Sequence, residues 1–174
     1  MHEFRLGNLL GAAALAISDR MLGAVTARVD GGPSAAAALV VLLEVGPMGV
    51  SRLGRCIGLT QSATTRAVDA LERQGLTRRT PAGRERVIEL TPSGRKLAQT
   101  VLDERRRWLD GLLATLDEAD SEAAERVLTT LLRGLYDSGR NSTLLCRYCD
   151  RDACTAESVC PVGQAERELG DTPP

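Results

Sequence analysis

The stretch that decides the fold is SRLGRCIGLTQSATTRAVDALERQGLTRRTPAGRERVIELTPSGRK, residues 51–96. Apolar residues at helical spacing predict a short helix over residues 51–58 and a longer one over residues 60–74. Thr60 is suited to cap the start of the longer helix, and Gly75 is suited to end it. The inward apolar face of this helix pair is expected to consist of Leu53, Ile57, Ala63, Val68 and Leu71.

A basic β-hairpin is expected directly after these helices. Residues 76–80 and 86–90 are short runs of strand-forming residues, and the turn between them contains Pro81 and Gly83. Two helices joined by a tight turn and followed by a hairpin form a winged helix-turn-helix. In that arrangement the second helix enters the major groove of DNA, and the hairpin reaches the adjacent minor groove.

The start of the predicted second helix carries side chains of the types that bond phosphates and base edges. From the hairpin, Arg86 is a further candidate for contact with DNA. The helix residues expected to contact DNA are Gln61, Ser62, Thr64, Thr65 and Arg66.

Positive charge is concentrated in the same stretch. The whole chain has 22 basic and 23 acidic residues, whereas residues 51–96 have nine Arg and one Lys against four acidic residues. Residues 97–174 have nine basic and fifteen acidic residues. Such a distribution draws a polyanion to one face of the molecule. The alternative is an ordinary solvated face, but the coincidence of the charge with the hairpin favours DNA binding.

Length and composition exclude several classes of protein. A chain of 174 residues fits one domain with a short appendage. We find no apolar run near the ~20 residues that span a bilayer, and no cleavage site follows the alanine-rich start, so we expect a cytoplasmic protein without a membrane partner. The one histidine, His2, lies at the chain end, and no catalytic triad or glycine-rich phosphate loop is present, so we expect no enzymatic activity.

Long amphipathic helices are expected on both sides of the central stretch. They cover residues 4–29 and 35–44 before it, with Ser34 as a cap, and residues 91–116 after it. A last helix begins at Asp120 or Ser121 and ends near residue 138. These helices carry more apolar surface than so small a domain needs, so we expect them to interleave with those of a second copy. The alternative is a monomer with a self-contained helical core.

In the expected homodimer, the two recognition helices lie about one DNA turn apart, ~34 Å. The apolar stripe expected to form the core between subunits is Leu97, Val101, Trp108 and Leu112. The predicted fold is therefore mainly α, with a small β-hairpin wing. Its parts are N-terminal dimerisation and support helices (1–48), a winged helix-turn-helix DNA-binding region (49–96), C-terminal dimerisation helices (97–140), and a cysteine cluster with a tail (141–174).

The residues QSATTRAVDALERQGLTR (61–78) and RVIELTPSG (86–94) resemble the multiple-antibiotic-resistance regulator (MarR) family. The helix order over residues 4–140 is similar as well. The resemblance implies a dimeric winged-helix regulator, usually a repressor that is relieved by a small-molecule effector or by oxidation. It also places Arg84 at the wing tip that enters the minor groove. The sequence departs from the family at Ala82, where an Asp that orients this arginine is common, and Glu85 is the candidate substitute.

The resemblance does not account for the last 35 residues, which contain Cys146, Cys149, Cys154 and Cys160. Four thiols so close together in a cytosolic chain indicate a metal centre. The single C-x2-C pair and the closing Cys-Pro favour an iron–sulfur cluster slightly over zinc, and the spacing leaves a metal-free disulfide switch or inert cysteines open. We expect this segment to pack against the dimerisation helices. Cys56 stands apart and is expected to be a small buried residue, with a redox sensor as the alternative.

Two functions remain. The first is a transcriptional regulator that binds a palindromic operator in double-stranded DNA as a homodimer, tuned by a redox- or metal-responsive centre. The alternative is a metal-bearing winged-helix adaptor or electron carrier that docks on protein. The basic block and the polar start of the second helix favour the regulator.

Overall fold

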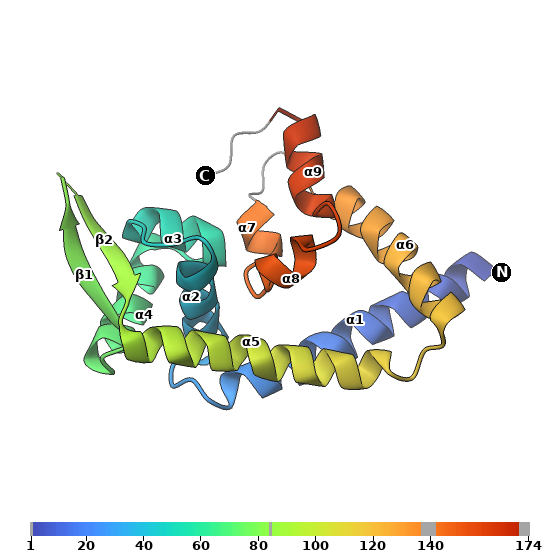
Figure 1. Cartoon of the computed structure of the whole chain (residues 1–174), viewed down its shortest axis with the longest axis horizontal. Helices are drawn as coiled ribbons and strands as arrows, with labels where there is room; N and C mark the ends of the chain where they lie inside the picture. The colour runs from blue at the N-terminus through green and yellow to red at the C-terminus, as the bar shows by residue number, and fades with distance from the viewer. Residues whose placement is uncertain (1, 84, 137–141, 171–174) are drawn as a thin grey trace.

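The structure is a computed structural model that describes residues 2–83, 85–136 and 142–170. The chain folds in the order α1 (His2–Thr26), α2 (Gly32–Glu44), α3 (Val50–Ile57), α4 (Gln61–Arg73), β1 (Thr77–Ala82), β2 (Glu85–Leu90), α5 (Pro92–Leu113), α6 (Glu118–Leu135), α7 (Ser142–Leu145), α8 (Arg151–Thr155) and α9 (Pro161–Glu168). Helices α3 and α4 and the hairpin lie at one end of the long helix α5, and α6 lies at the other (Figure 1). The structure thus confirms the predicted mainly α winged helix-turn-helix fold.

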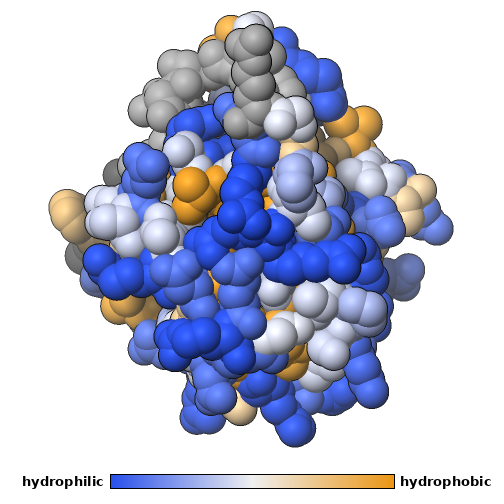
Figure 2. All heavy atoms as spheres, turned by 90° about the vertical axis from the view of Figure 1, so that its left-hand side faces the viewer, coloured by the Kyte–Doolittle hydropathy of each residue, from blue (hydrophilic) through white to orange (hydrophobic). Residues whose placement is uncertain are grey.

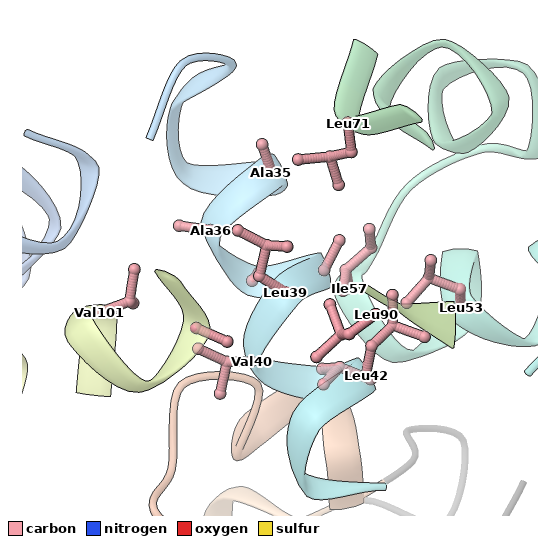
Figure 3. Close-up of a cluster of buried hydrophobic side chains, with 14 of the residues drawn as sticks. Ala35, Ala36, Leu39, Val40, Leu42, Leu53, Ile57, Leu71, Leu90 and Val101 are labelled. Atoms are coloured by element: carbon pink, nitrogen blue, oxygen red, sulfur yellow. The ribbon is translucent and has the colours of Figure 1, made fainter. Parts of the chain in front are cut away.

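The core is centred on α2, in which every residue from Ala35 to Leu42 is buried. Its alanines lie where neighbouring helices approach, and its larger residues fill the space between α3, α4 and the hairpin (Figure 3). Leu39 of α2, Leu53 of α3 and Leu71 of α4 are all fully buried. Because this core is continuous with β2 through Leu90, the helix-turn-helix, the hairpin and α2 form one packed unit.

The hairpin is a two-stranded antiparallel sheet. Its register pairs Thr77 with Leu90 and Ala82 with Glu85. A bridge between Met48 and Ile88 joins β2 to the segment before α3, with backbone hydrogen bonds of 2.8 and 3.2 Å. The hairpin is therefore held at its base and projects from the body at its tip.

Several predicted helix ends shift by a few residues. Helix α2 begins earlier than expected, because Gly31 adopts a positive φ of 116° and Pro33 occupies the first turn, so Ser34 is not the cap. Helix α6 begins at Glu118, since the Asp117 side chain accepts a hydrogen bond from Asp120 N at 2.8 Å. The end expected for this helix near residue 138 lies outside the described residues.

Helix α5 does not present the expected stripe to a partner along its whole length. Val101 is fully buried within the subunit, together with Ala98 and Leu102, where α5 packs on α2. The expectation for the first half of the stripe was wrong, because α2 covers it within the same chain. Trp108 is half-buried and Leu112 is 40% exposed, so the apolar surface that α5 exposes to solvent begins only in its second half.

Helix α1 is more apolar and more exposed than expected. The segment Phe4–Thr26 is long enough to cross a membrane, and its most apolar 18-residue window has a mean hydropathy of 1.4 and is only 6% buried. Leu6 and Leu15 are 68% and 69% exposed. The expectation that no segment reaches this length and composition was wrong, because small alanines and glycines extend the apolar run between the leucines.

Candidate nucleic-acid interface and cysteine cluster

The start of α4 presents polar groups to solvent. Thr60 is the N-cap, and its Oγ1 accepts a hydrogen bond from Ala63 N at 3.3 Å. Gln61, Ser62 and Arg66 are exposed, as expected for residues that contact DNA. No ion pair of Arg66 occurs within the described part of the chain, so its guanidinium is available to a phosphate or a base.

The structure does not place Thr64 on this surface. Thr64 is fully buried, and its hydroxyl donates to Thr60 O at 2.8 Å. A Cβ added to Gly54 would lie 2.7 Å from Thr64 Oγ1, so Thr64 fills the closest approach of α3 to α4. Helical periodicity explains this correction, because Thr64 lies on the same face as Val68 and Leu71. Thr65 is half-buried and donates to Gln61 O at 3.0 Å.

Arg79 connects the hairpin to α4, a role that the sequence analysis did not predict. Its guanidinium pairs with Asp69 at 2.7 Å and also with Glu72, and both carboxylates lie on α4. Asp69 and Glu72 are three residues apart, a spacing that could have indicated one shared partner. Part of the basic block therefore holds the hairpin against α4. Arg78 is likewise paired within the hairpin, with Glu89 at 2.7 Å.

The tip of the hairpin is exposed at Pro81, Ala82 and Gly83, where Gly83 has a φ of 63°. Arg84, expected at the wing tip, lies outside the described residues. Arg86 is exposed and donates to Arg79 O at 3.3 Å. Viewed from the hairpin end, the molecule shows mainly hydrophilic side chains with few apolar ones between them (Figure 2). Such a face suits a hydrated polyanion better than a dry protein contact.

The structure brings the four clustered cysteines to one cavity of about 330 Å³. The cysteine segment forms α7, α8 and α9, which lie between α3 and α6 (Figure 1). The expected packing on the helices after the hairpin is confirmed for α9, which contacts α6, while α7 contacts α3. The cysteine segment is thus a bridge between the two ends of the fold.

The clustered thiols contact one another in series. A hydrogen bond with Cys149 lowers the pKa of Cys146, whereas the same contact and burial raise the pKa of Cys149. Burial, together with the charge and hydrogen bonds of neighbouring thiols, raises the pKa of Cys154 to about 11. Cys160 Sγ accepts a hydrogen bond from Gly163 N at 3.4 Å at the start of α9.

No group of three or more His, Cys, Asp and Glu side chains in the described residues is arranged to hold a single metal ion. The four cysteines are also not joined by disulfides. The observation that supports the metal centre expected at Cys146, Cys149, Cys154 and Cys160 is that all four side chains line one cavity.

Cys56 is buried on α3, as expected for a small apolar residue. Burial raises the pKa of its thiol, and the nearby Arg52 only partly opposes this effect. Because thiolates are the reactive species, this environment argues against the redox-sensor alternative for Cys56.

Comparison with known proteins agrees with this architecture. The sequence model of the MarR family matches residues 33–84, which include α2, α3, α4 and β1. A MarR family protein from Bacillus stearothermophilus is 28% identical, with a TM-score of 0.69 over 77% of this chain and 95% of that chain. The YusO protein from Bacillus subtilis is 25% identical, with a TM-score of 0.63 over 75% of this chain and 93% of that chain.

MepR, a transcription regulator of the Staphylococcus aureus multidrug efflux pump MepA, shares the fold at 20% identity, with a TM-score of 0.65 over 75% of this chain and 98% of that chain. Among curated proteins, none matches the sequence. About a quarter of this chain therefore has no counterpart in these solved structures. The centre of the chain matches the MarR family model, and its fold is that of MarR-family proteins.

Proposed function

We propose that the chain is a homodimeric transcriptional regulator that represses transcription by occupying a palindromic operator. The observation that carries this proposal is the exposed polar start of α4 beside the basic hairpin, on a hydrophilic face of the molecule. Gln61, Ser62 and Arg66 supply donors and acceptors for base edges and phosphates. Arg86 supplies a further cation at the hairpin, next to the minor groove in this docking geometry.

Exposed apolar residues support the dimer. They lie on α1, at the end of α5 and along α6, where Val127, Leu128 and Leu135 are each more than half exposed. Apolar surface of this extent is rare on a monomer in water and marks an interaction surface. A second copy related by a two-fold axis would cover these helices and place the two α4 helices on one face of DNA.

We therefore assign α1 to the dimer and not to a membrane, and we propose that the protein is cytoplasmic. In the described structure α1 contacts both α2 and α5, which ties it to the DNA-reading unit. Cell fractionation tests this assignment: the full-length protein should stay in the supernatant after high-speed centrifugation, and recovery in the membrane pellet would contradict it.

The DNA-binding proposal is tested with Arg66→Ala on a duplex that the protein selects from a random-sequence pool. The loss should be on the order of 1–3 kcal/mol if Arg66 reads a base. The matched control is Arg126→Ala, which removes an exposed arginine from α6 and should leave affinity unchanged. Affinity should also fall steeply as salt rises, because phosphate contacts release counterions.

Two results would contradict the proposal. One is selection of no duplex at low salt. The other is a selected complex whose affinity is insensitive to salt and to Arg66→Ala. Either result would favour the adaptor that docks on protein.

A further inference from the structure

We propose that the cavity between α7, α8 and α9 holds an iron–sulfur cluster bound by Cys146, Cys149, Cys154 and Cys160, and that this cluster fixes the DNA-reading unit relative to α6. The assignment of the cluster stands on the cysteine site alone. Only its effect on DNA rests on the function proposed above.

The size of the site favours a cluster over a single zinc ion. Zinc draws four thiolates to ~2.3 Å around one point, and no three side chains within the described chain converge to hold one ion. The contacts of Cys146 with Cys149 and of Cys149 with Cys154 show that the thiols share one site, and they do not distinguish the two centres. The space that all four border is a cavity of about 330 Å³, which suits a multi-atom group.

Charge around the cavity suits an anionic group. Three arginines line it, Arg52, Arg151 and Arg167, against one acidic residue, Glu166, and a cluster bound by four thiolates is negatively charged. Arg105 of α5 partly opposes the rise in the pKa of Cys149, so its guanidinium lies within electrostatic reach of that thiol. The Nε of Arg105 is buried and has no hydrogen-bond partner among the described residues. Such an orphaned cationic donor is costly unless an anion accompanies it.

The backbone around Cys160 also suits a cluster ligand. Its Sγ accepts the Gly163 N–H at the N-terminus of α9, a position that stabilises negative charge on sulfur. Pro161 occupies the first turn, so no N–H is lost there. Hydrogen bonds to the ligating sulfurs are one of the means by which proteins tune such clusters.

The cysteine segment has too little core to hold its own shape. The apolar cluster on this side buries only Tyr136, Val162 and Ala165 among the described residues. Folded units of this size usually need an additional cross-link, such as a disulfide or a structural metal centre, to be stable. Four bonds from cysteines spread over fifteen residues would supply it, with release of one proton from each thiol on binding.

The cysteine segment joins the two ends of the subunit. On the α2 side, Arg151 N donates to a Glu44 carboxylate oxygen at 2.9 Å, and the Tyr148 hydroxyl donates to Pro33 O. On the α6 side, Arg133 pairs with Glu168. A bound cluster therefore stabilises one position of α6 relative to α2 and α3. Because α6 lies on the proposed dimer surface, its position sets the spacing of the two α4 helices in the dimer. The cluster site and the DNA-binding surface are therefore coupled through the position of α6.

The test uses full-length protein purified without oxygen and reconstituted with ferric iron, sulfide and a thiol that reduces part of the iron. The parent should bind roughly two or four iron ions and as many sulfides per chain, with visible absorbance. Cys149→Ser and the more exposed Cys154→Ser should each lose iron and absorbance. Cys56→Ser is the matched control, since Cys56 does not line the cavity, and it should keep both. Stoichiometric zinc that excludes iron, or a colourless protein that binds neither metal, overturns the assignment.

The coupling is measured on the same proteins. Cys154→Ser should weaken binding to the selected duplex roughly tenfold, in the range typical of allosteric coupling, and should speed proteolysis within residues 142–170. Arg66→Ala should weaken DNA binding and leave iron content unchanged. Equal DNA affinity of the parent and Cys154→Ser overturns the coupling. If no protein binds DNA while iron still binds, the proposed function fails and the cluster stands.

Discussion

Gly94, in the first turn of α5, lies against the carbonyl group of Leu76. A Cβ added to Gly94 would be 1.8 Å from Leu76 O, and Thr91 Oγ1 also bonds to the carbonyl oxygens of Gly75 and Leu76. The motif L-T-x-x-G therefore has a physical reason: threonine caps α5 and ties it to the end of α4, and glycine permits the close approach. This junction aligns α5 with the recognition helix.

Gly94→Ala should destabilise the protein strongly. The added methyl group would meet backbone, which cannot move aside as a side chain can, so the loss should reach at least the ~1–3 kcal/mol typical of overpacking. Urea denaturation measures it. The matched control is Gly111→Ala in the same helix, where a Cβ meets nothing within 4 Å, and this change should stabilise by ~0.5–1 kcal/mol. Equal effects of the two substitutions would contradict the close approach.

Arg79→Ala should loosen the hairpin without unfolding the core. Arg79 is only a quarter exposed, and it joins β1 to Asp69 and Glu72 of α4. A double-mutant cycle with Asp69→Asn should give a coupling near ~0.5–1 kcal/mol, since the aspartate is half exposed and screened. Arg78→Ala is the control, because Arg78 pairs within the hairpin. Zero coupling in the Arg79 cycle would show that the pair does not hold the hairpin.

Leu112→Asp should give folded monomers. Leu112 is 40% exposed within the subunit, so a charge there is tolerated by the monomer but costly in the proposed dimer core. Sedimentation measures the change, and binding to a palindromic duplex should be lost with it. Leu169→Asp changes an exposed leucine just after α9 and should remain dimeric. A stable dimer of Leu112→Asp would show that this end of α5 is not part of the dimer interface.

Burial of the Glu44 carboxyl should make stability depend on pH, and the hydrogen bond from Arg151 N only partly opposes this effect. Burial raises the pKa of Glu44 above its ordinary value of 4.5, and the charges of Asp150 and Asp152 add to the rise. The folded state therefore holds this proton more tightly than the unfolded state. The resulting stability is present below pH 4.5 and is lost as pH rises through the folded pKa.

Glu44→Gln tests this effect, because glutamine keeps an oxygen for the Arg151 N–H and carries no charge. The variant should gain stability relative to the parent as pH rises above 4.5, measured by urea denaturation at several pH values. Glu122→Gln on the exposed face of α6 controls for the loss of one negative charge. A stability difference that stays constant with pH would contradict the raised pKa of Glu44.

The sequence by itself determined the winged helix-turn-helix, because its signals are local. Thr60 as a cap, Gly75 as an end and the strand-forming runs beside Pro81 and Gly83 act within a few residues. The exposed start of α4 follows from the same periodicity, and strict use of that periodicity would also have placed Thr64 inside.

Only the tertiary structure decided which long-range partners these elements have. Three contacts join residues on different elements. They are the burial of Val101 by α2, the pairing of Arg79 with α4, and the bridge from Arg151 and Glu168 to the ends of the fold. Such contacts depend on how helices pack in three dimensions, and packing responds to the shape and volume of the whole core. For the same reason the four cysteines were evident as a group, while their position between α3 and α6 was not.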